Sequence, residues 1–290
     1  MFLVSRIFFL QILAGDEFIR RSRENIEQFL YIPAHRGEIY DRNFTPMKKN
    51  IPLVYNRVVF NIYMIPEKSH KKKDDIILSL YQEIRNLNKI INIGEDVIRE
   101  KLNTARIKYE PVLIKSDVTP EEIIEIAEQK EKFPRVIWKN ESKRIYRYNN
   151  FAAHLLGYIG KISRNDLIQL KDPSYHGNQS IGKMGIERQY DKVLRGTDGK
   201  IKKIVNVRSK VESQEVDLEP VPGNNLILTI DYNIQRAAEE ALKHYKKAAA
   251  VVIRAGTGEI LAMISKPDFN PNEFSFGISK ERWDEVANDP

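Results

Sequence analysis

Hydrophobic positions in residues 55–102 change their spacing from one segment to the next. Residues 55–65 are rich in β-branched and aromatic side chains and end at Pro66, which predicts a strand. The charged run after it, residues 68–75 (KSHKKKDD), predicts a solvated loop. A shorter helix is expected over 95–102. Between the charged loop and this short helix, apolar residues recur every three or four positions, which predicts an amphipathic helix over 75–91. These residues are Ile76, Ile77, Leu80, Ile84, Leu87 and Ile91.

Two further helices carry capping signals at their first residues. Residues 119–122 (TPEE) place a threonine three positions before a glutamate, with proline at the first helical position, and predict a helix to about residue 132 that Pro134 closes. Ser163 with Asp166 gives the same spacing and predicts a helix through Leu170.

Shorter elements complete the central part of the chain. Residues 112–114 and 136–138 are candidates for short strands beside the helices. Residues 185–194 predict a helix that ends at Gly196. The basic stretch 195–210 predicts a solvated hairpin. Helices and strands in this order favour an α+β fold.

The pattern changes near residues 220–224, where we place a domain boundary. Residues 226–231 (LILTID) predict a strand, 232–245 a helix, and 248–267 a strand, a turn and a strand. We expect 226–231 to lie antiparallel beside the two later strands. That sheet would leave an apolar face or edge uncovered, and poor solubility of the C-terminal part would follow.

The N-terminal residues 1–13 are apolar apart from Ser5, Arg6 and Gln11. A membrane-spanning helix needs about 20 apolar residues, so this segment cannot span by itself. Its charge lies inside the apolar run, which is a poor match to a signal peptide. It is interpreted as the distal half of a longer apolar helix, a helix lying on a surface, or an ordinary amphipathic core helix. Residues 16–30 predict a polar helix that continues it as a stalk.

Composition narrows the chemistry. The 290 residues are 42% hydrophobic and 30% charged, which is globular, and the length fits about two domains. The net charge of +7 is spread along the chain, so solvated charge is a better interpretation than a nucleic-acid surface, and no nucleic-acid partner is predicted. With no cysteine, the chain has no disulfide, thiol nucleophile or cysteine-type zinc site.

Two serine–lysine pairs have the spacing of an acyl-enzyme nucleophile, Ser69 with Lys72 and Ser180 with Lys183. Such chemistry needs both side chains on one helical turn, in a pocket that deprotonates the lysine. The first pair lies in a solvated basic run, and the second lies among glycines that indicate a loop. Neither is predicted to be catalytic. The five histidines show no metal-ligand spacing, so no metal and no cofactor are predicted.

Residues 36–43 (RGEIYDRN) resemble the first N-terminal motif of class B penicillin-binding proteins. Residues 182–196 and 270–279 resemble the elongation enzymes of that family, penicillin-binding protein 2, more than its division enzymes. Further blocks similar to successive segments of the family follow in the family's order, at 144–163, 181–199, 222–242 and 248–274. The likeness covers nearly the whole chain.

The resemblance implies a partial membrane-anchor helix and stalk over 1–30, an elongated pedestal (dimerisation) domain over 31–220, and the start of a transpeptidase domain over 221–290. Phe44, Met47 and Lys48 depart from the family's usual turn after DRN. The family's Ser-x-x-Lys, Ser-x-Asn and Lys-Thr-Gly motifs are absent in the right context, so the chain is expected to be cut at both ends and inactive.

The family's reaction is serine-type D,D-transpeptidation of peptidoglycan stem peptides, and penicillins acylate the same serine. No residue present here can be assigned that role. The resemblance also implies an inner-membrane location with the bulk of the chain on the periplasmic side. The partners it implies are a SEDS-family glycosyltransferase and a rod-shape scaffold protein. The alternative is a stand-alone, non-catalytic envelope module that binds elongation partners.

The signature residues are interpreted as structural, because they offer guanidinium forks, a carboxylate and glycines without a nucleophile. Arg36 or Arg42 is hypothesised to pair with Glu187, and Gly185 to allow the close approach of the two segments. Separate surface ion pairs are the alternative. The residues assigned to this structural motif are Arg36, Gly37, Asp41, Arg42, Asn43, Gly185 and Glu187.

Overall fold

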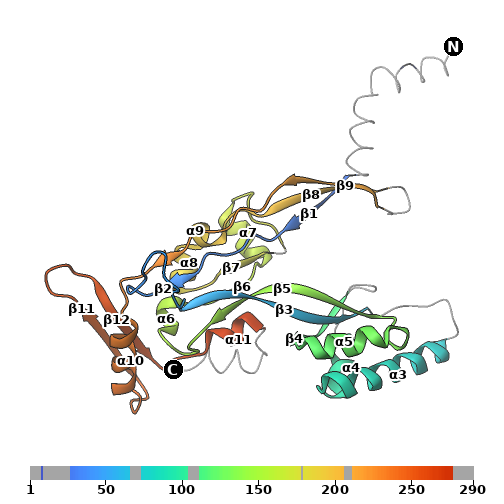
Figure 1. Cartoon of the computed structure of the whole chain (residues 1–290), viewed down its shortest axis with the longest axis horizontal. Helices are drawn as coiled ribbons and strands as arrows, with labels where there is room; N and C mark the ends of the chain where they lie inside the picture. The colour runs from blue at the N-terminus through green and yellow to red at the C-terminus, as the bar shows by residue number, and fades with distance from the viewer. Residues whose placement is uncertain are drawn as a thin grey trace. The chain divides into compact units, whose positions relative to one another are not determined.

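The computed structural model describes Phe8 and residues 27–65, 73–103, 111–177, 179–205 and 211–276 (Figure 1). The chain divides into two compact units: one takes residues 1–55 and 146–275 and the other takes 56–145, apart from a few residues near the C-terminus. The boundaries predicted at residues 30 and 220 separate an anchor, a pedestal domain and a transpeptidase domain, not compact units, and they stay a prediction. Among the described residues, no helix has the length and apolar character to cross a bilayer.

The second unit is a small sheet covered by helices. Strand β3 (Val54–Met64) pairs with β4 (Val112–Val118) and with β5 (Val136–Tyr146). The covering helices are α3 (Lys73–Ile91), α4 (Glu95–Asn103) and α5 (Pro120–Glu128), followed by the 3₁₀ turn η2 (Lys130–Lys132). The core lies between helices and sheet, and its fully buried members include Ile62, Ile84, Leu87, Ile91 and Ile126.

The predicted strand 55–65, the helices 75–91 and 95–102, and the capping box at Thr119 are confirmed. The Thr119 side chain accepts from the backbone N–H of Glu122, and the Glu122 side chain accepts from that of Thr119. Both short strand candidates are longer than predicted, because pairing with the eleven-residue β3 carries β4 and β5 beyond their apolar stretches. Most of the predicted loop 68–75 lies outside the described residues.

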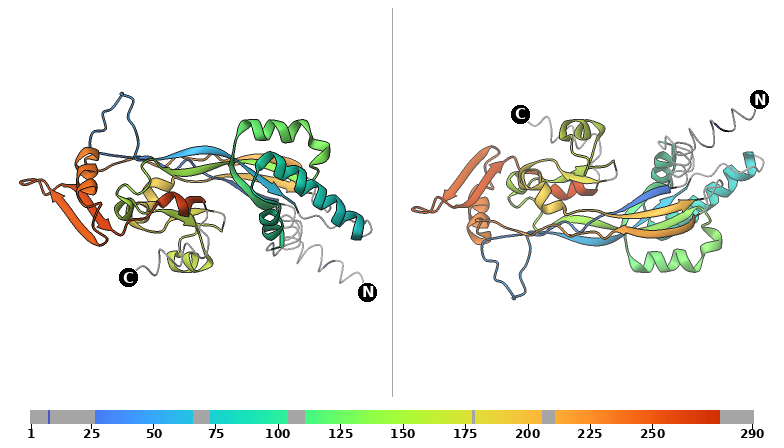
Figure 2. Two further views of the ribbon diagram at one scale, coloured as in Figure 1. Left: turned by 90° about the horizontal axis from the view of Figure 1, so that it is seen from below. Right: turned by 90° about the horizontal axis from the view of Figure 1, so that it is seen from above.

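A three-stranded sheet of order β1–β8–β9 belongs to the first unit (Figure 2). It consists of β1 (Glu27–Ile32), β8 (Gly199–Val205) and β9 (Val211–Leu218), all antiparallel. A hairpin is present, but it is displaced from the predicted range 195–210: only its first strand, β8, lies in that range, and its second strand, β9, begins at Val211. The turn between them lies outside the described residues. The predicted helix over 16–30 is wrong for its last four residues, because residues 27–30 pair with β8 as a strand.

Six short elements follow one another in the middle of the first unit. They are α6 (Ala153–Leu156), β6 (Ile159–Lys161), α7 (Arg164–Leu170), β7 (Ser180–Gly182) and the helix pair α8 (Gly185–Gln189) and α9 (Asp191–Arg195). The capping box at Ser163 is confirmed. The single helix predicted over 185–194 is two helices, because Tyr190 leaves helical geometry between them, with φ −108° and ψ 23°.

The last part of the first unit contains β10 (Leu226–Ile227), α10 (Tyr232–Ala241), the hairpin β11 (Ala248–Ile253) and β12 (Ile260–Lys266), and α11 (Pro271–Phe276). The predicted strand 226–231 is wrong in length and in partner. Only two of its residues form a strand, and they pair in parallel with β2 (Ile39–Tyr40). Asp231 then caps α10 by accepting from the N–H groups of Asn233 and Ile234, which ends the extended stretch.

The hairpin β11–β12 is antiparallel as predicted, and α10 packs against β12 (Figures 1 and 2). Val251 and Ile253 remain 49% and 58% exposed, so part of the hairpin is apolar and uncovered among the described residues.

Candidate functional site

Arg36 lies at the centre of a buried ion cluster in the first unit. Its Nε donates to the Oε2 atom of Glu187 at 2.7 Å, and one terminal nitrogen donates to the Glu187 backbone carbonyl at 3.0 Å. The same nitrogen lies 2.7 Å from Glu187 Oε2 and 2.8 Å from the Oδ1 atom of Asp191. The side chains of Arg36 and Glu187 are 9% and 0% exposed. The contact hypothesised for Arg36 is therefore present, and it is buried rather than superficial.

Two carboxylates fix the charge of this guanidinium. Burial lowers the pKa of Arg36, but the nearby carboxylates of Glu187 and Asp191 raise it by more, so the pKa lies above its ordinary value. Asp191 is further held by hydrogen bonds: its Oδ2 accepts from the Tyr175 hydroxyl at 2.8 Å and its Oδ1 from the Gly182 N–H at 2.8 Å. Burial, together with the bond to Asp191, raises the pKa of Tyr175 to about 12. We refer to Arg36, Glu187, Asp191 and Tyr175 as the Arg36 cluster.

The rest of the RGEIYDRN segment runs beside residues 223–230. Gly223 N–H donates to the His35 carbonyl at 2.8 Å, and Leu226 and Leu228 donate to Glu38 and Tyr40 at 2.9 and 3.0 Å. Gly37 is needed in this ladder, since an added Cβ would lie 1.9 Å from the Asn224 carbonyl oxygen. The Gly37 N–H also donates to the Leu194 carbonyl at 2.7 Å. The signature segment therefore joins α9 to the chain that leads into α10.

Arg42 does not contact Glu187, so that alternative of the hypothesis is wrong. Arg42 lies six residues after Arg36, beside the start of α10, and its guanidinium reaches Glu259 Oε2 at 3.3 Å and the Thr229 carbonyl at 3.4 Å. Arg254 also reaches Glu259, at 3.1 Å. Arg42 thus connects the signature segment to the turn of the β11–β12 hairpin.

Asp41 and Asn43 lie at the N-terminus of α10. Asp41 accepts from the Asn43 side chain at 2.8 Å and from the Tyr232 N–H at 3.4 Å. Asn43 also reaches the helix-capping carboxylate of Asp231 at 3.5 Å. A carboxylate beside a helix N-terminus is stabilised by the free N–H groups there.

Gly185 makes a close approach, but to a different segment from the one hypothesised. Its φ is +61°, and an added Cβ would lie 2.4 Å from the Leu155 carbonyl oxygen and 2.7 Å from the Gly157 nitrogen. Gly185 therefore lets α8 begin against the end of α6, not against Arg36.

Asp191, Tyr175 and Glu259 were missed from the sequence. A usable signal existed for Asp191, because it follows Glu187 by four positions and so can share a helix face with it. No local signal marks Tyr175 or Glu259, which reach the site through tertiary contacts only.

The serine–lysine pair at Ser180 is held in a geometry unsuited to acyl transfer. Ser180 is in strand β7, not in the predicted loop, and the Nζ atom of Lys183 lies 2.5 Å from the Oδ2 atom of Asp166. The Lys183 ammonium is therefore bound to the Asp166 carboxylate, and Ser180 and Lys183 do not lie on one helical turn. Ser69 and Lys72 lie outside the described residues. Among the residues that the structure describes, no group of three or more His, Asp or Glu side chains could hold a metal ion.

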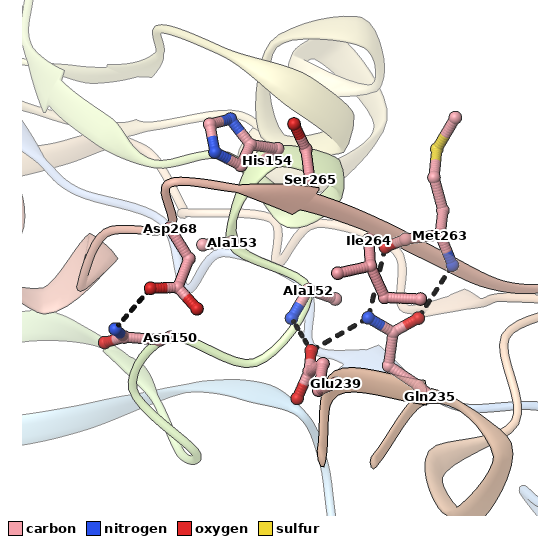
Figure 3. A pocket seen from close by; sticks show the side chains of 10 residues that line it. All are labelled: Asn150, Ala152, Ala153, His154, Gln235, Glu239, Met263, Ile264, Ser265 and Asp268. Carbon is pink, nitrogen blue, oxygen red and sulfur yellow. Dashed lines mark hydrogen bonds between the residues drawn. The ribbon is translucent and has the colours of Figure 1, made fainter. Parts of the chain in front are cut away.

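A small polar pocket lies between the 150–154 segment, α10 and β12 (Figure 3). Glu239 accepts from the backbone N–H of Ala152 and from the side chain of Gln235, both at 2.8 Å. The buried Gln235 also bridges to both backbone groups of Met263, at 2.8 and 3.1 Å. Ala152 has φ +47°, a left-handed conformation that costs energy outside glycine. The hydrogen bond from its N–H to Glu239 helps to hold this turn, so the polar groups of the pocket have a structural role.

The penicillin-binding protein dimerisation domain matches residues 31–228. The chain belongs to the penicillin-binding proteins. The peptidoglycan D,D-transpeptidase MrdA of Escherichia coli K12 is 32% identical over 296 residues, a match that covers 99% of this chain and 44% of that protein. The chain therefore spans less than half the length of this relative.

Two solved structures are similar to this penicillin-binding protein. PBP2 of Helicobacter pylori, in a complex with MreC, superposes with a TM-score of 0.69 at 26% identity, over 91% of this chain and 47% of that one. A chain of a peptidoglycan synthase complex that coordinates polymerization and crosslinking has a TM-score of 0.62 at 24% identity, over 99% and 48%, a likeness of fold. The predicted resemblance to the PBP2 type and the α+β fold with a pedestal domain are confirmed.

Proposed function

We propose that this chain is the pedestal-bearing portion of a peptidoglycan D,D-transpeptidase that acts in cell-wall synthesis and cell elongation. Its residues supply anchoring, support and partner docking. The cross-linking chemistry belongs to the transpeptidase domain, to which residues 221 onward are assigned. The family match and the MrdA relative support a role in cell-wall synthesis.

One observation carries the supporting role. The RGEIYDRN segment is bonded on one side to α8 and α9 through the Arg36 cluster, and on the other side to residues 223–232 and the hairpin turn. Buried, doubly paired arginine gives a connection with a fixed geometry, because the guanidinium fork orients both carboxylates at once. A rigid connection of this kind suits a part that positions a following domain.

The proposed partners are a rod-shape scaffold protein and a SEDS-family glycosyltransferase. The similar PBP2 of H. pylori is in a complex with MreC, and the other similar chain belongs to a complex that couples polymerization with crosslinking. The proposed location is the inner membrane, with the bulk of the chain on the periplasmic side. This location rests on the family resemblance. The apolar segment 1–13, which would form part of an anchor helix, lies outside the described residues apart from Phe8.

Depletion of the protein in the cells that produce it tests this function. Loss of an elongation transpeptidase should round the cells and reduce the cross-linked fraction of new peptidoglycan, measured by microscopy and by muropeptide analysis. Filamentous cells would point to a division enzyme instead. Unchanged shape with unchanged cross-linking would favour the stand-alone, non-catalytic module.

A further inference from the structure

The strand β9 is the open edge of the β1–β8–β9 sheet. Its residues 213–218 are all exposed, and among the described residues no strand pairs with its outer side. At the opposite edge, the β1 residue Tyr31 stacks on His176 with ring centroids 3.9 Å apart, and Ala34 donates to Asp198. An unpaired edge offers a row of backbone donors and acceptors that another strand can satisfy. In Figures 1 and 2 β9 forms the rim of this sheet.

The edge strand exposes apolar side chains at Val216 and at its last residue, Leu218, which is 48% exposed. Leu30, Ile201 and Val216 are directly opposite one another on β1, β8 and β9, so their side chains share one face. Leu30 and Val216 are 49% and 52% exposed. A fourth strand would extend this row by placing its own residue beside Val216. That residue should be apolar, preferably β-branched.

The flanking positions of the edge are acidic. Glu215 and Asp217 precede and follow Val216, and Glu219 comes just after the strand; all are exposed. The Nζ atom of Lys200, a residue of β8, lies 3.5 Å from the Oδ2 atom of Asp217. The Asp217 side chain is still 50% exposed. The position beside Glu215 on a fourth strand, and the end of that strand near Asp217, would therefore favour lysine or arginine.

We propose that β9 is a docking edge for an extended segment of a partner protein in which basic and apolar residues alternate. The alternation follows from the strand period of two over residues 213–216, which pair with β8 in regular register. Between Val216 and Leu218 the register shifts by one residue, so Asp217 lies at a bulge and its carboxylate would meet the end of the added strand. Addition of a strand to an open sheet edge is a general mode of peptide recognition. A second copy of β9 fits poorly, because its own acidic residues would face these. This inference deepens the docking role of the proposed function and rests on it.

A defined peptide tests the proposal on the full chain. The probe is a fluorescent peptide with the sequence acetyl-Thr-Lys-Val-Lys-Val-Thr-amide, and its matched control has glutamate in place of both lysines. We expect the basic peptide to bind and the acidic one to bind about tenfold more weakly or worse, measured by fluorescence anisotropy. The double variant Glu215→Lys with Asp217→Lys should reverse this preference. Glu125→Lys with Glu128→Lys, two exposed positions on α5, is the matched control and should leave it unchanged.

Backbone pairing is the readout that simple charge attraction would not give. Hydrogen exchange should show the amides of 213–218 protected when the basic peptide is bound. Binding without this protection, or binding that the edge variant does not reverse, would overturn the proposal, and so would dimerisation of the chain that the edge variant abolishes. Failure here leaves the depletion experiment unaffected, so the docking edge and the proposed function can fail separately.

Discussion

At the scale of single residues, the Arg36 cluster is the feature with the greatest energetic consequence. One guanidinium, 9% exposed, serves two buried carboxylates, with nitrogen–oxygen distances of 2.7 and 2.8 Å. A pair in such surroundings is costly to break, because the remaining charges stay buried after their partner is gone.

Replacement of this arginine should therefore destabilise the chain strongly. Arg36→Met is expected to lower the free energy of unfolding by roughly 3–5 kcal/mol, and Arg36→Lys by less, because lysine keeps the charge but loses the fork. The measurement is urea unfolding at neutral pH. Arg57→Met is the matched control, since Arg57 pairs with Asp117 at the surface, where side chains are 50% and 36% exposed, and should cost at most about 1 kcal/mol. Equal losses for Arg36→Met and Arg57→Met would contradict the buried cluster.

Gly37 and Gly177 differ in the space available for a side chain. Gly37→Ala should prevent the ladder between 35–40 and 223–228 from forming, because the new Cβ would lie 1.9 Å from the Asn224 oxygen. Gly177→Ala, where no atom lies within 4 Å of the added Cβ, should leave the melting temperature nearly unchanged. If both variants melt like the parent chain, the close approach at Gly37 is not present in solution.

The sequence could predict that an arginine of RGEIYDRN meets Glu187, but it could not choose between Arg36 and Arg42. Both carry the same fork, and they are only six positions apart. The choice is made by the parallel pairing of β2 with β10, which carries Arg42 to Glu259 and leaves Arg36 at α8. That pairing joins residues almost 190 positions apart, so no local pattern reveals it.

At the scale of elements, capping signals were the most dependable part of the sequence. The boxes at Thr119 and Ser163 are present as predicted, because each needs only residues within one helical turn. The errors came where a distant strand decides the structure. The spacing of Phe18, Ile26, Phe29 and Leu30 predicts a helix through residue 30, yet residues 27–30 belong to β1, because β8 supplies their backbone partners. Residues 228–231 lose their strand because Asp231 caps α10.

The start of α7 predicts a stability change at low pH. Burial raises the pKa of Asp166, but hydrogen bonds from Lys183 and Ser163 lower it by a larger amount, so that the pKa is about 2. The unfolded value is about 3.9, so the carboxylate stabilises the folded chain above about pH 4 and loses this effect as the pH falls toward 2. The difference in unfolding free energy between the parent chain and Asp166→Asn should be constant from pH 5 to 7 and shrink below pH 4. A difference that stays the same at pH 2.5 would contradict the assignment.

At the scale of the whole molecule, the proposed function makes this chain the support of an enzyme whose chemistry lies in another domain. The buried contacts join the segments of the family's signature to one another, and none of them presents an activated nucleophile in the part of the chain that the structure describes. The signature residues are therefore structural. This is why the family resemblance can be recognised from the sequence although no catalytic residue can be assigned in it.

The most direct measurement of this claim uses a fluorescent penicillin in the cells that produce the protein. An antibody to residues 31–220 captures it, and the size and label of the captured band are recorded. The account predicts a penicillin-labelled band of roughly twice the mass of this chain, in line with the 44% of the MrdA relative that the chain covers. An unlabelled band at this chain's own mass would contradict it and identify a binding module without transpeptidase chemistry.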